Sequence, residues 1–271
     1  MDNRNNFVSA DPGGQHAIQS QTEEQLLQFQ KITLQEMEAV QLQDRMDTKL
    51  VFHRDRLPFI LARLKDDYLV FEINNCRLSP YQTLYFDDDR WKLYLMHHNE
   101  KMNRFKLRYR TYVNSDLSFF EVKYKNNKGR TQKERIKVPC VSNEIDESAA
   151  KLMKEITNLE PAGFFPKLWV NYSRITFVSK LKTERVTVDL HLCYKNNDSR
   201  IALDDLVIAE VKQGRASSGS PFLRLMKEQG IRAGAISKYC LGVVMLHDNV
   251  KKNNFKIKMM TVNKILNTPK D

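Results

Sequence analysis

One stretch of the chain, residues 104–137, alternates positively charged residues with aromatic and aliphatic ones. Its first segment sets Phe105, Leu107 and Tyr109 between four cations, Arg104, Lys106, Arg108 and Arg110. The alternation returns around Lys123 and Lys125 and again at Lys133, Arg135 and Lys137, with polar turn sequences at 114–116 and 126–129. A period of two is typical of a pleated strand, so the stretch predicts three consecutive β-strands with one cationic face.

This cationic face needs a physical explanation. Like charges placed opposite one another on neighbouring strands destabilise a sheet. Two explanations remain open from the pattern alone: the face is solvated, or it encloses a polyanion that offsets its charge. The other face is nearly continuous in apolar residues and predicts a normal hydrophobic core.

Composition narrows the classes of protein. The 271 residues, 41% of them hydrophobic, suffice for one large β-rich domain with helical additions. A net charge of +11 predicts an anionic partner such as nucleic acid, a membrane surface or a phosphate-rich molecule. The N-terminus has no apolar run of signal-peptide length, and the longest apolar run, 239–246, is too short to span a bilayer, which predicts a cytoplasmic protein. The four scattered cysteines, Cys76, Cys140, Cys193 and Cys240, are interpreted as small buried hydrophobic residues.

The rest of the chain divides into three parts. Residues 1–20 are expected to be a disordered tail, 21–44 an amphipathic helical segment and 45–265 the main domain. Within the domain, strands are expected at 45–52, 68–73, 81–86, 172–176, 185–192, 205–212 and 255–262, and helices at 55–65, 146–159, 221–230 and 235–246. The helix at 146–159 is expected to have Asp146 or Ser148 as its cap.

Two polar features lie between these elements. The acidic sequence 87–89 is interpreted as a solvated turn, in preference to a metal site. His97 and His98 are expected to follow a strand and precede the basic hairpin, where one of them could approach a ligand. Closing eight or nine half-polar strands with the charged face inside gives an α+β protein built on a barrel, with helices on the outside.

The order of the motifs resembles the VTC domain of vacuolar transporter chaperone-type polyphosphate polymerases, in its bacterial form, a branch of the triphosphate tunnel (CYTH-like) superfamily. The resemblance runs from about 45 to 262. Its pieces are Asp-Thr-Lys-x-x-Phe at 47–52, Arg-x-Lys-x-Arg-x-Arg at 104–110, Glu-Val-Lys at 121–123, Gly-Arg-Thr-x-Lys-x-Arg at 129–135, Tyr-x-Arg at 172–174, Arg-Val-Thr-Val-Asp at 185–189, Ala-Glu-Val-Lys at 209–212 and Ser-Lys-Tyr at 237–239.

The resemblance implies a fold and a site. The fold would be an eight-stranded antiparallel β-barrel tunnel, with a C-terminal helix near the tunnel mouth. Catalytic roles would fall on Lys49, Arg108, Arg110, Lys123, Lys133, Arg174 and Lys238. Substrate would also be bound by Arg104, Lys106, Arg135, Tyr172, Arg185 and Ser237, and Mn²⁺ or Mg²⁺ by Glu210 with help from Asp189.

The implied activity is ATP-dependent polyphosphate synthesis, with ATP and inorganic polyphosphate or pyrophosphate as ligands. Where many tunnel enzymes begin Glu-x-Glu-x-Lys, this chain has Arg45, Asp47 and Lys49, which lowers the carboxylate count. The alternatives are a triphosphatase of the same fold and a non-catalytic polyphosphate sensor. An RNA-binding barrel is disfavoured because the aromatic residues lie on the face opposite the cations, so no nucleic-acid partner is expected. No membrane insertion is expected, although a separate membrane partner would be compatible with the resemblance.

Overall fold

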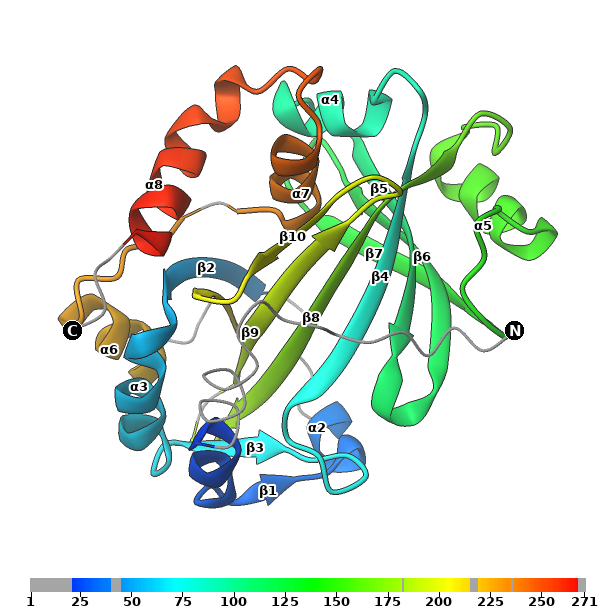
Figure 1. Ribbon diagram of the computed structural model, residues 1–271. Coiled ribbons are helices and arrows are strands. Elements are labelled where there is room, and N and C mark those ends of the chain that lie inside the picture. The colour runs from blue at the N-terminus through cyan, green and yellow to red at the C-terminus, as the bar shows by residue number, and fades with distance from the viewer. Residues whose placement is uncertain (1–20, 40–44, 182, 215–218, 235, 268–271) are drawn as a thin grey trace.

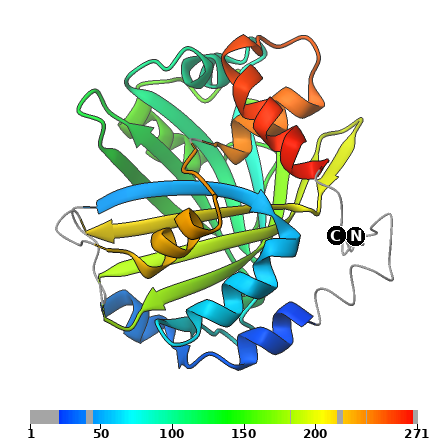
Figure 2. The same ribbon diagram turned by 90° about the vertical axis from the view of Figure 1, so that its left-hand side faces the viewer.

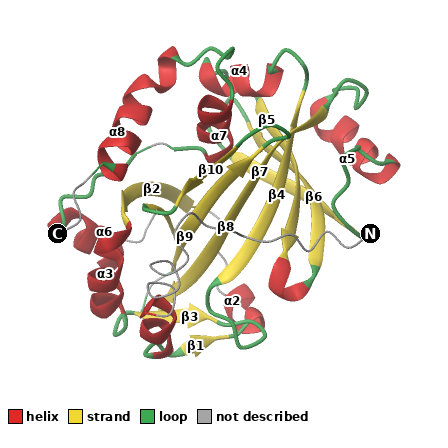
Figure 3. Ribbon diagram, in the orientation of Figure 1, coloured by secondary structure: helices red, strands yellow, loops and turns green. Residues whose placement is uncertain are grey.

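The computed structural model describes residues 21–39, 45–181, 183–214, 219–234 and 236–267. Its centre is a sheet of eleven strands, in which eight follow the order β2-β11-β9-β8-β4-β5-β6-β7. These strands are β2 Arg45–His53, β4 Ser79–Asp87, β5 Arg104–Tyr112, β6 Leu117–Lys125, β7 Thr131–Val138, β8 Phe165–Ser179, β9 Glu184–Lys195 and β11 Leu206–Gly214. Every ladder along this path is antiparallel. The long strands β4, β8 and β9 run side by side through the molecule (Figures 1 and 3).

The predicted antiparallel sheet is confirmed, whereas closure into a barrel is not. Within the described ranges, β2 and β7 end the path and no ladder joins them. The inner face of β7 carries Lys133, Arg135 and Lys137, and closure would bring these cations toward β2, whose inner face carries Lys49. Like-charge repulsion opposes that approach in the absence of an anion.

The strand register puts the predicted cations on one face. Lys49 lies opposite Glu210, Arg174 opposite Asp189, and Arg108 opposite Glu121. The alternating residues point to the other face, where they form two apolar cores. One core packs helices α3 (Leu57–Leu64) and α6 (Pro221–Glu228) on β2, β8, β9 and β11, and the second packs α5 (Glu147–Thr157) on β5, β6 and β7.

The inner face is itself covered at one end. Helices α4 (Lys92–His98), α7 (Lys238–Leu246) and α8 (Lys256–Leu266) gather there, as Figures 1 and 2 show. Leu168, Val170 and Tyr194 of the sheet join buried residues of α7 in a third apolar cluster. The charged part of the inner face lies next to these helices and forms the candidate site, which is lined by His97 of α4, Cys240 of α7 and Lys258 of α8 as well as by strand residues. None of the described helices is long and apolar enough to cross a membrane.

Three small strands extend the sheet. β1 (Lys31–Ile32) pairs in parallel with β3 (Tyr68–Phe71), which joins β8, and β10 (Arg200–Leu203) pairs with β9. The segment 21–44 is thus helical at 21–27 and in α2 (Leu34–Ala39), but β1 separates these helices. The predicted disordered tail 1–20 and residues 40–44 lie outside the described residues.

The strand predicted at 255–262 is wrong. This segment forms a short 3-10 turn, Asn253–Phe255, and then α8. Its apolar residues fit both periods: Phe255, Ile257 and Met259 alternate, but Phe255, Met259 and Val262 also follow a helical spacing. Packing decides for the helix, because Phe255 and Val262 are buried against the α7 cluster while Ile257 is 80% exposed.

The strand predicted before His97 is wrong, and the acidic turn is solvated at Asp89, whose side chain is 78% exposed, but not at Asp87. Asp87 is fully buried, and its carboxylate accepts hydrogen bonds from the backbone N–H groups of Leu93 and Tyr94 at 2.8 Å and from the Tyr239 hydroxyl at 2.5 Å. The acidic sequence is therefore the cap of helix α4, and His97 lies in the last turn of that helix.

Other predictions of local structure are confirmed. Asp146 caps α5 by accepting from Ala149 N–H, and Pro58 lies in the first turn of α3, which follows a 3-10 turn at Arg54–Arg56. Cys193 and Cys240 are buried, as interpreted, whereas Cys76 is partly buried and Cys140 is exposed.

Candidate functional site

A cavity of about 560 Å³ opens on the polar part of the inner face. Its wall combines residues from β2, β5, β6 and β11 with the segment that leads into α7. The lining residues that carry charge or a polar group include Asp47, Lys49, His97, Glu100, Arg104, Lys106, Lys123, Lys125, Glu210, Ser237 and Lys258. Cations therefore outnumber carboxylates on this wall.

Three lysines of the wall form no direct ion pair with a carboxylate among the described residues, although the charge of Glu210 acts on Lys49 and Lys123. Lys49 Nζ donates to the backbone oxygen of Ile236 at 3.3 Å, and Lys106 Nζ donates to Ser237 Oγ at 2.8 Å. Lys123 lies next to Lys106 in the register. Burial lowers the pKa of Lys106 and Lys123, and the positive charges of neighbouring cations, Lys49 included, lower both further. These ammonium groups leave a positive charge that an anion in the cavity would offset.

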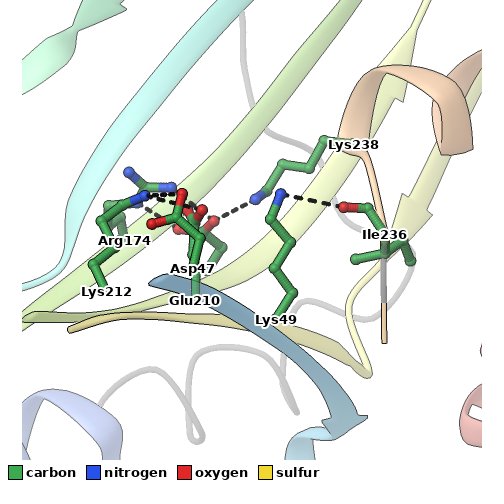
Figure 4. A network of polar contacts seen from close by, with 8 residues as sticks. Asp47, Lys49, Arg174, Glu210, Lys212, Ile236 and Lys238 are labelled. Atoms are coloured by element: carbon green, nitrogen blue, oxygen red, sulfur yellow. Dashed lines mark hydrogen bonds and ion pairs between the residues drawn. The ribbon is translucent and has the colours of Figure 1, made fainter. Parts of the chain in front are cut away.

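Two carboxylates converge on a cation at the same wall. Lys212 Nζ lies between Glu210 Oε1, at 3.0 Å, and Asp47 Oδ2, at 3.1 Å, as Figure 4 shows. Burial would raise the pKa of Glu210, but Lys49, Lys212 and Lys123 outweigh it and lower the pKa. The pair thus provides ionised oxygen donors for a hard divalent cation, which commonly takes one or two carboxylates and completes its shell with phosphate oxygens. In the part of the chain that the structure describes, no group of three or more His, Cys, Asp or Glu side chains could hold a metal by itself.

The start of α7 closes one side of the cavity. Ser237 caps the helix by accepting from Cys240 N–H and also accepts from Lys106, so its hydroxyl hydrogen remains free to donate. The next residue, Lys238, forms an ion pair with Asp189, which Arg174 contacts with Nε at 2.6 Å and Nη2 at 2.9 Å. Both oxygens of Asp189 are therefore engaged by cations (Figure 4 shows Arg174 and Lys238).

A second cationic group lies deeper on β5, β6 and β7. Arg108 Nη2 lies 2.6 Å and Lys133 Nζ 3.1 Å from the carboxylate of Glu121, with Arg110 Nη1 at 3.8 Å. These cations hold the pKa of Glu121 well below its usual range despite complete burial. The charges of Arg108, Arg110 and Lys106 likewise outweigh burial and lower the pKa of Tyr85 to about 8.

Tyr172 lies among the inner cations without lining the cavity. Its ring stacks on Tyr81 at a centroid distance of 5.2 Å, and Lys238 Nζ lies 4.9 Å from its centroid. Arg110 and Arg174 also lie over this ring, at 6.0 and 5.2 Å. The aromatic faces thus stabilise the cations through their quadrupoles.

The remaining predicted residues are more scattered. Arg104 lines the cavity. The guanidinium carbon of Arg135, on β7, lies 4.4 Å from the centroid of the Phe119 ring on β6. Arg185 lies opposite Lys212 on β9, away from the lining residues. His97 does line the cavity: its Nε2 lies 3.0 Å from the Phe105 backbone oxygen, and burial next to Lys106 lowers its pKa to about 2, which keeps it neutral.

The sequence analysis assigned no role to several residues of the site. Glu121 and Lys212 appeared there only as parts of motifs, although each bridges groups that the site depends on. A signal for Glu121 was available, because a lone carboxylate in a row of cations is expected to pair with them. Lys258 carried no such signal, since it was assigned to a strand that the structure shows to be a helix.

Several solved structures share a remote similarity with this chain. One is a candidate adenylate cyclase from Vibrio parahaemolyticus, with 12% identity, a TM-score of 0.43 and coverage of 73% of this chain and 99% of that chain. Another is a candidate adenylyl cyclase from Hippeastrum, described as having a dominant triphosphatase activity, with 11% identity, a TM-score of 0.47 and coverage of 74% and 96%. Curated proteins gave no match.

The family comparison is more specific. The model of the VTC domain matches residues 44–247, well over half of the 271 residues. The match contains Lys49, Lys106 and Lys123, the carboxylates of β2 and β11, and the start of α7, but not Lys258. The chain belongs to the VTC domain family.

Proposed function

We propose that the protein is a polyphosphate polymerase that transfers the γ-phosphate of ATP to the end of an inorganic polyphosphate chain. Membership of the VTC domain family supports an activity on polyphosphate or a triphosphate. The observation that carries the proposal is the set of cavity lysines, Lys49, Lys106 and Lys123, which form no direct ion pair with a carboxylate in the described part of the chain. Partly buried cations of this kind are suited to a ligand with several adjacent negative charges.

The cavity residues would bind and orient the phosphates. Lys49, Lys106 and Lys123 contact phosphate oxygens from three strands, and Ser237 donates its free hydroxyl hydrogen. The inner cations Arg108, Arg110, Lys133, Arg174 and Lys238 extend the path for a longer chain, with Tyr172 among them. Arg104, Arg135 and Arg185 add positive electrostatic potential at the edges of this path.

Transfer requires charge neutralisation and in-line positioning more than a protein nucleophile. The terminal oxygen of the chain forms a bond to the γ-phosphorus, and the bond from that phosphorus to the β–γ bridging oxygen breaks, which leaves ADP. The lysines stabilise the negative charge on the transferred group and on the departing oxygen.

A divalent cation fits the carboxylates of β2 and β11. Glu210 and Asp47 would hold Mn²⁺ or Mg²⁺, which, when bound, neutralises phosphate charge and polarises a phosphoryl oxygen. Asp189, which the resemblance assigns to the metal together with Glu210, forms ion pairs with Lys238 and Arg174. Its expected part is therefore to position these cations.

The proposal is tested by incubating the purified protein with ATP and Mn²⁺ and separating the products on a gel that resolves phosphate chains, with a parallel assay for free phosphate. The variants are Lys123→Met, Lys49→Met and Glu210→Gln. Lys151→Met is the matched control, because Lys151 is exposed on α5 away from the cavity. We expect a ladder of chains for the wild type and the control, and a loss of roughly 100-fold or more in the other variants.

Other outcomes select a different function. Free phosphate without chains would replace the polymerase with a triphosphatase. Tight binding of added polyphosphate without turnover would replace it with a polyphosphate sensor. Chains made equally well by all variants would refute the assignment of the cavity as the active site.

A further inference from the structure

Glu121 has an unusual environment for a carboxylate on a strand of a cationic sheet. Its side chain is completely buried, and it receives Arg108 Nε at 2.8 Å and Nη2 at 2.6 Å on one oxygen. Lys133 Nζ contacts its other oxygen at 3.1 Å. One carboxylate thus serves at least two cations that the proposed function assigns to phosphate binding.

The pairing uses the donors that a phosphate would need. All three nitrogens of Arg108 have acceptors within the protein, because Nη1 donates to the Tyr85 hydroxyl at 2.9 Å. Lys49, Lys106 and Lys123 differ, since none of them forms a direct ion pair with a carboxylate among the residues that the structure describes. An incoming anion therefore finds the cavity lysines available but must compete with Glu121 for Arg108 and Lys133.

We propose that Glu121 is an internal counter-anion, a positioning residue that occupies Arg108 and Lys133 when no polyanion is bound and that weakens the binding of phosphate chains. The identity of the ligand rests on the proposed function, whereas the competition rests on the contacts themselves. Because a phosphate must displace Glu121 from Arg108 and Lys133, the net free energy gained on binding is smaller. A bound phosphate chain is therefore released more readily.

This role and a merely structural role predict effects of opposite sign. If Glu121 only holds the arginine in place, its removal disorders the site and weakens anion binding. If it competes, its removal leaves the partly buried Arg108 and the more exposed Lys133 without a carboxylate partner, which destabilises the free protein and strengthens anion binding. The direction of the change in affinity separates the two roles.

The experiment measures the dissociation constant of inorganic tripolyphosphate by calorimetry at fixed ionic strength. Glu121→Gln is compared with the wild type and with Glu155→Gln, a matched change at an exposed position of α5. We expect about tenfold tighter binding for Glu121→Gln and no change for the control. The melting temperature of Glu121→Gln should fall without ligand and return toward the wild-type value with tripolyphosphate, and in the chain-synthesis assay both KM and kcat should fall.

Weaker or unchanged binding by folded Glu121→Gln would overturn the proposal. If this variant does not fold, Glu121→Asp retains the charge but draws the carboxylate away from Lys133, and it should bind tripolyphosphate about two- to fivefold more tightly than the wild type. Weaker or unchanged binding there would refute the competition equally. Because the binding measurement needs no turnover, a protein that makes no chains but shows the tighter binding would refute the proposed function and leave this inference standing.

Discussion

Two groups of cations on the same sheet face differ in their partners. Arg108, Lys133 and Arg174 contact carboxylates, whereas Lys106 and Lys49 donate to a hydroxyl and a backbone oxygen. Burial of Lys106 removes its hydration without a carboxylate beside it, and the pKa of this lysine falls. A phosphate bound there would supply the opposite charge and raise this pKa toward its usual range.

This difference predicts a pH dependence of anion binding. The pKa of Lys106 and Lys123 is lowered from 10.5 in the free protein, mainly by burial, and a bound phosphate favours the charged forms. Tripolyphosphate affinity should therefore fall as the pH rises from neutrality toward 10.5, and binding in that window should take up protons. Calorimetry in buffers of different ionisation enthalpy measures this uptake.

Lys106→Arg serves as the control for the pH dependence. An arginine stays protonated throughout this window, so the fall in affinity should be shallower than in the wild type. Identical slopes for the two proteins would mean that Lys123 or the ligand, and not Lys106, is responsible for the titration.

At this scale the sequence identified the type and the face of the site residues but not their partners. The alternation around Arg108 fixed its face, because the period of a strand admits two faces only. Which carboxylate it meets depends on the register between β5 and β6, and a shift of one residue would have replaced Glu121 by an apolar neighbour.

Among the elements, α7 links the sheet to the site, because it packs into the apolar end of the inner face and presents Ser237 and Lys238 at its start. Gly242 makes close packing possible. A Cβ added there would lie 2.5 Å from Tyr194 Cδ1 and 2.8 Å from Leu168 Cδ1. It would therefore clash with two fully buried side chains. The helix could not lie this close to β8 and β9 with a larger residue.

Gly242→Ala should therefore destabilise the protein although alanine is the better helix former. Overpacking lowers the free energy of unfolding by about 1–3 kcal/mol, whereas the better helix propensity of alanine raises it by roughly 1 kcal/mol. Urea unfolding measures the difference, with Asn263→Ala at an exposed position of α8 as a control that is expected to be nearly neutral. An increase in stability for Gly242→Ala would show that α7 can move away from the sheet at no cost.

Element prediction failed where one local pattern satisfied two periods. The alternation of 255–260 favoured a strand, and only the burial of Phe255 and Val262 against α7 selects the helix. Helix α4 was missed for a related reason, because its cap, Asp87, precedes it by several residues and also binds the Tyr239 hydroxyl from a distant helix. Contacts between remote segments are not visible in a local pattern.

At the scale of the whole molecule, β2 and β7 are the two ends of the described strand order and are not paired with each other. Both strands line the cavity, β2 through Asp47 and Lys49 and β7 through Thr131. Periodicity predicted eight or nine strands, and the resemblance to the VTC domain implied that eight of them form an antiparallel sheet. Neither predicted that the sheet stays open, because closure depends on the balance of charge across the edges and not on the pattern of any strand.

The net charge of +11 has a consequence for stability. The positive charges of the inner face repel one another in the folded state and are further apart in the unfolded chain, so an anion bound in the cavity should stabilise the fold. At a tripolyphosphate concentration 100 times its dissociation constant, the gain is about 2.7 kcal/mol, or roughly 5–10 °C in melting temperature for a protein of this size.

Sodium chloride at matched ionic strength should give a smaller increase, since it screens charges without bridging the lysines. Replacing Lys49 and Lys123 together by methionine should remove most of the shift caused by tripolyphosphate while leaving that caused by sodium chloride. Equal shifts in the double variant and the wild type would locate the stabilising anion elsewhere on the surface.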